Sequence, residues 1–344
     1  MITTTCPEAT KEILMSPKYP KAKFLYKRLF NLFGQRFLGN GLVTAQNHEL
    51  WYKQRRIMDP AFSSLYLGGL MGTFNERAEN LMKLLKNTDD SPFPKAIEMC
   101  LKGMVCYLRD SFFEFKRKNR PFMNEVREAC RLLRTTGAQW IQNRKIAMQN
   151  GDDVPKDILT QIIKSAGKEE SMTKEDEELM LDNFVTFFIA GQETTANQLA
   201  FCIMELGRHR DILEKVTKEV DDVIGMKQDI TYDDLGKLVY LGQFSSYVTG
   251  RMDKFFKDPL TFDPDRFHPD APKPYYCYYP FALGPRACLG KNFAQMEAKV
   301  VIAKLLQRFD FTLTPGQSFD ILDTGSLRPK SGVVCLINHR NHKK

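Results

Sequence analysis

Apolar residues recur every three or four positions over most of the chain, which is the period of amphipathic helices. This period predicts helices over Pro7–Met15, Phe24–Phe37, Asn47–Arg56, Phe74–Leu85, Pro94–Leu108, Phe122–Met148, Asp152–Ile163, Leu179–Leu206, Arg208–Gly225 and Lys291–Leu306. A short helix is also expected after the potential cap Thr231, ending near Gln243. The chain is therefore expected to be mainly helical.

Strict alternation of apolar and polar residues occurs only near the C-terminus. Residues Phe309–Thr314 alternate, Pro315 and Gly316 mark a turn, and Gly332–Ile337 contains a second apolar run. The two runs predict a hairpin, followed by a basic, disordered tail. The expected fold class is mainly α with small β-sheets, of the α+β type.

Residues Thr173–Asp176 predict a capping box, and the helix that it opens, Leu179–Leu206, combines two unusual features. Around Phe184–Ile189 it is apolar on every face, which is typical of a helix buried on all sides. Its middle then contains Ala-Gly-Gln-Glu-Thr-Thr from Ala190 to Thr195, although glycine and threonine destabilise a helix interior. Such exceptions tend to mark function, and small residues here would leave room for a ligand beside the helix. The structural alternative is a kink with threonine bonded back to its own helix.

Composition is compatible with one large helical unit. The chain has 344 residues, of which 43% are hydrophobic, and a net charge of +8 without a nucleic-acid-binding motif. We interpret the charge as solvated surface, with an acidic protein partner or anionic lipid as the second interpretation. The eight cysteines are scattered without a Cys-x-x-Cys spacing, which favours reduced thiols in a cytosol-facing protein. No signal peptide or membrane-spanning apolar run is visible, so we expect no inserted helix.

One loop carries the strongest chemical signal. From Phe281 to Gly290 the sequence reads Phe-x-x-Gly-x-Arg-x-Cys-x-Gly, directly before a predicted helix. Gly284 and Gly290 allow the backbone to approach a flat cofactor, and Arg286 can pair with a carboxylate. Cys288 would lie at a helix N-terminus, where the dipole and free amides stabilise a thiolate. A buried structural cysteine is the alternative, but it would not require this spacing.

This loop resembles the haem-thiolate signature of the cytochrome P450 family, and the resemblance implies the other roles. Cys288 would be the axial ligand of a haem iron, here haem b. Trp51 and Arg55, four residues apart, would bind haem propionates together with Arg286, although an arginine beside a buried tryptophan is more often simple packing. Ala190 and Gly191 would line the oxygen site. Thr194 would order a water for proton delivery, with Glu193 as the acid neighbour.

The resemblance covers residues 1–344 as one cytochrome P450 domain, with three interruptions. The N-terminal anchor is missing, a packed helix is absent near Asn87, and the Glu-x-x-Arg helix and following strands expected after Gln243 are absent. In the family, those strands contribute a further propionate contact. The arginine matching Arg266 pairs with this Glu-x-x-Arg element, so we expect Arg266 to lack its partners, at a cost of about 3–5 kcal/mol if it is buried.

The resemblance implies an oxidoreductase that uses dioxygen and electrons from NADPH, delivered by a flavoprotein reductase on the basic face near Cys288. Within the family, longer segments resemble a sterol-hydroxylating member, which implies sterol metabolism at the cytosolic face of the endoplasmic reticulum membrane. Three hypotheses stay open at this point. They are an active sterol monooxygenase, a truncated non-catalytic product that cannot hold haem stably, and a protein that binds haem or sterol without turnover.

Overall fold

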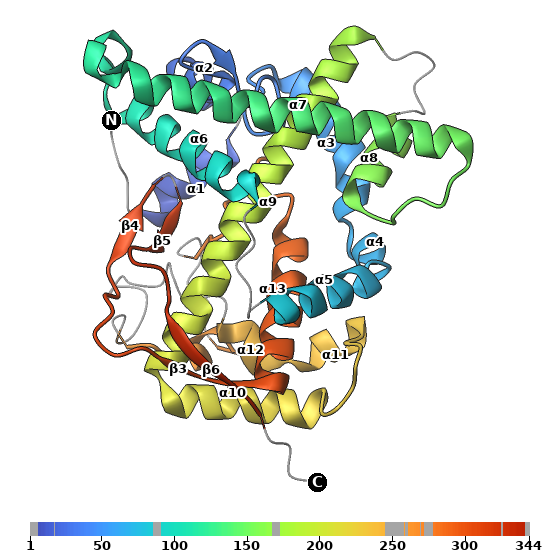
Figure 1. The fold of residues 1–344 in the computed structure, drawn as a ribbon, viewed down its shortest axis with the longest axis vertical. Coiled ribbons are helices and arrows are strands. Elements are labelled where there is room, and N and C mark those ends of the chain that lie inside the picture. Colours follow the sequence, from blue (N-terminus) through green and yellow to red (C-terminus); the bar gives the residue numbers. More distant parts are fainter. Residues whose placement is uncertain are drawn as a thin grey trace.

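The protein is described by a computed structural model that covers residues 6–16, 18–84, 91–166, 173–244, 258, 261–268, 270–271, 278–324 and 326–340. The helices are α1 (Pro7–Met15), α2 (Lys23–Phe30), α3 (His48–Met58), α4 (Ser64–Gly68), α5 (Met71–Leu84), α6 (Pro92–Arg109), α7 (Arg120–Asn150), α8 (Ile158–Ala166), α9 (Lys174–Arg208), α10 (Arg210–Val223), α11 (Tyr232–Lys237), α12 (Val239–Phe244) and α13 (Lys291–Arg308). The strands are β1 (Asn31–Leu32), β2 (Gln35–Arg36), β3 (Phe309–Leu313), β4 (Ile321–Asp323), β5 (Leu327–Pro329) and β6 (Cys335–His339). The predicted fold class, mainly α with small antiparallel sheets, is confirmed (Figure 1).

Helix α9 runs through the middle of the molecule, and the other elements pack around it (Figure 1). It contacts α7 toward one end and α10 and α13 toward the other. The predicted capping box is confirmed, because the Thr173 hydroxyl and the Asp176 carboxylate each accept the other residue's backbone N–H. A strong start signal and an apolar middle thus give a long central helix that carries the Ala190–Thr195 segment.

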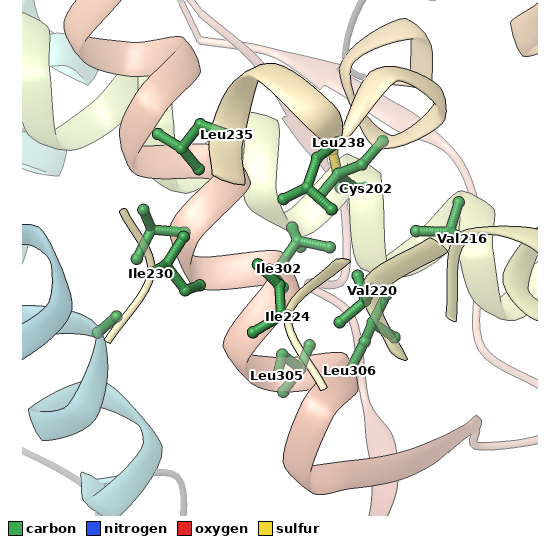
Figure 2. Close-up of a cluster of buried hydrophobic side chains, with 14 of the residues drawn as sticks. Cys202, Val216, Val220, Ile224, Ile230, Leu235, Leu238, Ile302, Leu305 and Leu306 are labelled. Atoms are coloured by element: carbon green, nitrogen blue, oxygen red, sulfur yellow. The ribbon is translucent and has the colours of Figure 1, made fainter. Parts of the chain in front are cut away.

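The larger core cluster lies where α10, α11 and α13 meet (Figure 2). Helix α10 presents Ile212, Leu213, Val216 and Val220 on one face, as its amphipathic sequence predicts. Helix α13 buries side chains on most of its faces because it is enclosed by α5, α9 and α10. This packing fixes the helix that follows the Cys288 loop.

The predicted helix Phe24–Phe37 is wrong beyond Phe30. The chain instead turns back as the hairpin β1–β2, with Phe33 and Gly34 in the left-handed region at φ 48° and 83°. Phe33 tolerates this conformation because its ring is buried against Tyr107 and Phe113, with centroid distances of 4.7 and 5.6 Å. Contacts from α6 and the loop after it therefore override the local helical pattern.

The predicted C-terminal pairing is confirmed, with a shift of boundaries. Strand β3 pairs antiparallel with β6, from Phe309 opposite His339 to Leu313 opposite Cys335. The sequence did not predict the second hairpin, β4–β5.

The helix predicted over Asp152–Ile163 begins only at Ile158, because the Asp157 carboxylate caps it by accepting the Thr160 N–H at 2.8 Å. The basic tail beyond residue 340 lies outside the described residues.

A buried ion cluster ties α9 to the N-terminal segment. The Asp182 side chain is 0% exposed and accepts hydrogen bonds from Arg36 at 3.0 and 2.6 Å, from Arg134 at 2.9 Å and from the Asn40 N–H at 2.8 Å. Gly39 is required beside it, since a β-carbon there would collide with the carboxylate. The cluster holds the loop after β2 against α9.

Arg266 has hydrogen-bond partners on the nearby backbone, in place of the Glu-x-x-Arg pair of the family. Its guanidinium donates to the backbone carbonyls of Asp263, Asp258 and Thr261, at 3.2, 3.1 and 2.9 Å. Carbonyl oxygens thus accept its hydrogen bonds, so the cost of an unpartnered buried charge does not arise. The junction after Gln243 and the turn near Asn87 lie largely outside the described residues.

None of the helices in the described ranges has the length and the apolar character to cross a bilayer.

Candidate functional site

The Cys288 loop closes on itself before α13 begins. The Cys288 N–H donates to the Phe281 carbonyl at 2.8 Å, and the Ala287 N–H donates to the Gly284 carbonyl at 3.0 Å. Ala282 and Gly284 adopt left-handed conformations at φ 59° and 75°, which turn the chain sharply. The loop therefore presents the Cys288 side chain to the neighbouring cavity.

That cavity has a volume of about 1280 Å³, larger than the sites that hold a single drug-sized ligand. Its wall brings together the Cys288 loop, α3, α9 and α13, segments that lie far apart in the sequence. Most of the predicted site residues line it, namely Trp51, Arg55, Ala190, Gly191, Thr194, Phe281, Arg286, Cys288 and Gly290. The cavity is thus large enough for a cofactor and a substrate together.

The face of α9 toward the cavity carries the small residues of the Ala190–Thr195 segment. A β-carbon on Gly191 would meet no atom within 4 Å, so the glycine opens free space. The Thr194 hydroxyl donates to the Ala190 carbonyl at 2.7 Å and also lines the cavity. The threonine is therefore bonded back to its own helix and still borders the cavity.

Cations gather at the end of the cavity formed by α3 and the Cys288 loop. Arg55 donates to the Ala287 carbonyl at 2.9 Å and pairs with Asp59 at 2.7 Å. The Arg286 guanidinium donates to the Ala45 carbonyl at 3.1 Å and stacks on the Trp51 ring at 4.0 Å from its centroid. Trp51 is 3% exposed, and its indole N–H has no acceptor among the described residues. This end is therefore suited to a negatively charged group.

A family model described as cytochrome P450 matches residues 95–245 and 243–336.

The chain belongs to the cytochrome P450 family.

Known relatives align along nearly the whole chain. The 11-oxo-beta-amyrin 30-oxidase of Glycyrrhiza uralensis is 26% identical over 97% of this chain and 78% of the relative. Cytochrome P450 4V2 of Rattus norvegicus is 24% identical over 97% of this chain and 79% of the relative. A bifunctional cytochrome P450/NADPH–P450 reductase of Alternaria alternata is 25% identical over 86% of this chain and 33% of that longer protein.

These comparisons also locate differences from the family. The first alignment runs over 418 positions, more than the 344 residues of this chain, so that relative contains segments without a counterpart here. The family match itself is divided into two parts that meet at residues 243–245. This break falls at Gln243, after which the sequence lacks the expected Glu-x-x-Arg region.

Family membership implies a haem iron with a thiolate ligand, and the cavity residues of this cytochrome P450 fit such a group. Cys288 faces the cavity, and a β-carbon on Gly290 would meet only the Cys288 sulfur within 4 Å. The indole N–H of Trp51 and the guanidinium of Arg286 are donors without an anionic partner in the described part of the chain. A flat cofactor with two carboxylates would provide anionic acceptors for these two donors.

The pKa of the Cys288 thiol is shifted in the direction opposite to the one expected at a helix N-terminus. The Gly290 N–H and the charge of Arg55 lower its pKa, as a helix N-terminus should, but burial is the largest effect and raises the pKa overall. A bound metal ion would supply the positive charge that deprotonates a ligating thiol.

Two predicted residues lie away from the cavity. The Glu193 carboxylate accepts hydrogen bonds from Asn197 at 3.0 Å and from Ser326, near the β4–β5 turn, at 2.8 Å. Gly284 faces α1, where a β-carbon would collide with the Leu14 carbonyl. The glycine is therefore needed for the approach of α1, rather than for the approach of the backbone to a cofactor.

Among the lining residues that sequence reasoning did not single out are two charged ones, Lys21 and Glu297. Lys21 follows Pro20 in a stretch without a motif, so no sequence signal marks it. Glu297 offered a signal, because it lies one turn after Phe293 on the apolar face of α13. Burial raises the pKa of Glu297 to about 7, although a hydrogen bond from Thr195 opposes the shift.

Replacing Glu297 with glutamine is expected to weaken the pH dependence of stability. The folded carboxyl stays protonated up to about pH 7, whereas the unfolded carboxyl ionises near its ordinary pKa of 4.5. Its contribution to stability is therefore complete below pH 4.5 and is lost as the pH rises through 7. From pH 5 to 8 the cofactor-free parent should lose about 2–3 kcal/mol relative to the variant, measured by urea unfolding. An equal difference at both pH values would contradict this assignment.

Proposed function

We propose that this chain is a haem-thiolate monooxygenase that hydroxylates the side chain of a sterol, as cholesterol 24-hydroxylase does. The observation that carries the proposal is the cavity shared by Cys288, the Gly191–Thr194 face of α9 and the cationic end at Arg286. These three regions meet only in the folded chain, and each suits a different part of a haem. Haem b would supply the oxygen chemistry when bound, inserting one atom of dioxygen into a C–H bond.

In this proposal the chain binds and orients the cofactor from two sides. Cys288 holds the iron, and Trp51, Arg55 and Arg286 bind the propionates. Phe281, Gly284 and Gly290 shape the loop around Cys288. Ala190 and Gly191 leave room beside the iron, and the Thr194 hydroxyl orders a water that delivers a proton. Glu193 is the acid neighbour of Thr194. Its carboxylate lies on the side of α9 away from the cavity, where it accepts hydrogen bonds from Asn197 and Ser326.

The sterol assignment rests on the cavity lining and on sequence likeness. Away from the cations, the wall includes Phe62, Phe74, Phe187 and Phe293, which suit a large apolar substrate. The segments Trp51–Arg56, Asp182–Gly191 and Leu305–Phe309 resemble cholesterol 24-hydroxylase. The relatives carry other printed names, among them an oxidase of 11-oxo-beta-amyrin, so the substrate requires a direct test.

The proposed partner is an NADPH-dependent flavoprotein reductase, and the proposed location is the cytosolic face of the endoplasmic reticulum membrane. The relative in which a cytochrome P450 is fused to a reductase supports this source of electrons. The net charge of +8 suits an acidic partner or an anionic membrane surface.

The deciding experiment combines a spectrum with turnover. The chain is expressed with a haem precursor, reduced and exposed to carbon monoxide, and should show the red-shifted Soret band of a thiolate complex. It is then supplied with a reductase, NADPH and cholesterol, and the products are identified by mass spectrometry. A thiolate band without sterol oxidation would reject the substrate and keep the cofactor assignment.

Replacing Thr194 with alanine is expected to uncouple electron use from hydroxylation. The variant should consume NADPH at a similar rate but yield at least about tenfold less product per NADPH, because proton delivery typically contributes about 10²–10⁴-fold. Thr186→Ala is the matched control, since its hydroxyl makes the same back-bond, to the Asp182 carbonyl at 2.8 Å. Unchanged product per NADPH in Thr194→Ala would remove Thr194 from the proton path.

A second candidate is a non-catalytic family member that cannot hold haem stably. The observation in its favour is the divided family match at residues 243–245, after which the sequence contains no Glu-x-x-Arg. It predicts that the purified chain shows no thiolate band and releases added haem quickly. The same carbon monoxide spectrum therefore separates the two candidates.

A further inference from the structure

Lys21 lies in the wall of the cavity at its cationic end, ahead of α2. Its ammonium donates to the Val43 carbonyl and lies 4.7 Å from the centroid of the Tyr26 ring. Within the described part of the chain, no carboxylate lies within ion-pair distance of it. Burial and the nearby charge of Arg286 lower the pKa of Lys21 to about 8.

Like Lys21, Arg286 lies in the cavity wall without a carboxylate partner among the described residues. Its partners are the Ala45 carbonyl and the Trp51 ring, and no described carboxylate pairs with it. Arg55 differs, because Asp59 already neutralises it at 2.7 Å. The end of the cavity thus contains two partly buried cations that repel each other and face open space.

Such a pair is unfavourable unless an anion binds between them, because burial weakens the hydration of each charge and strengthens their repulsion. Haem carries two propionates, and the proposed function places them at this end of the cavity. We propose that Lys21, together with Arg286, binds the propionates of the haem and so positions the cofactor. This inference rests on the proposed function, since the anion it names belongs to the haem. Two unpaired cations would then balance two carboxylates.

The test measures how fast haem leaves the protein. Haem-loaded parent and Lys21→Gln are mixed with excess apomyoglobin, and haem transfer is followed by absorbance. Loss of one charge-assisted hydrogen bond is expected to speed release roughly tenfold. Lys21→Arg keeps the charge and should release haem at nearly the parent rate. Lys18→Gln changes an exposed lysine of the same segment and serves as the matched control.

Haem dimethyl ester, which lacks the propionate charges, makes the test specific. Parent and Lys21→Gln should release this ester at equal rates, because Lys21 then has no anion to bind. A purely structural role would instead accelerate the release of both cofactors. Equal release of ordinary haem from parent and Lys21→Gln would overturn the inference.

The outcome for Lys21 is separable from that for the proposed function. A parent that binds haem without a thiolate band would contradict the monooxygenase proposal, yet the comparison of release rates would still decide the role of Lys21. A parent that takes up no haem overturns both.

Discussion

Replacing Cys288 with serine is expected to abolish the red-shifted carbon monoxide band and any turnover of the proposed substrate. Serine is nearly isosteric, but its hydroxyl stays protonated and does not replace a thiolate as an iron ligand. The loop should keep its shape, because its bonds are made by backbone atoms, such as the Cys288 N–H to the Phe281 carbonyl. The measurement is the spectrum of the reduced, carbon monoxide-treated variant beside its far-UV circular dichroism.

The matched control is Cys6→Ser, which changes an exposed thiol at the start of α1. It should keep the thiolate band at full amplitude. A thiolate band that persists in Cys288→Ser would mean that another cysteine binds the iron. Loss of helical signal in Cys288→Ser would show instead that the side chain supports the fold.

The parts of the site that could be predicted from sequence are those specified by neighbouring residues. The loop from Phe281 to Gly290 and the capped start of α9 at Thr173 are local patterns, and both form as expected. The small residues at Gly191 and Thr194 also face the cavity, because a helix places residues three or four apart on one side.

Contacts between distant segments could not be predicted in the same way. Phe33 leaves the predicted helix because Tyr107 and Phe113, from α6 and the loop after it, enclose its ring. Glu193 turns toward Ser326, more than a hundred residues later in the chain. Lys21 reaches the cavity only because the segment before α2 folds beside Arg286. In each case tertiary packing, rather than local preference, decides the position.

Replacing Asp182 with alanine is expected to lower the free energy of unfolding by about 3–5 kcal/mol. The carboxylate is fully buried and accepts hydrogen bonds from two arginines and from the Asn40 N–H. Its removal leaves the Arg134 guanidinium, whose side chain is 10% exposed, with less compensation. Urea unfolding measures the loss. Asp222→Ala, which breaks the exposed pair with Lys218, should cost no more than about 1 kcal/mol.

Removal of the Asp182 carboxylate should also weaken haem binding at the cationic end of the cavity. The next residue, Asn183, accepts the Leu42 N–H at 2.8 Å, and Val43 and Ala45 in the same loop supply the carbonyls that Lys21 and Arg286 bind. A loosened loop would displace both cations, so haem should leave Asp182→Ala faster than Asp222→Ala even before urea unfolds either protein. Asp182→Asn keeps an acceptor for the Asn40 N–H and should lie between them. Equal haem release from all three would show that the ion cluster stabilises the fold without supporting the site.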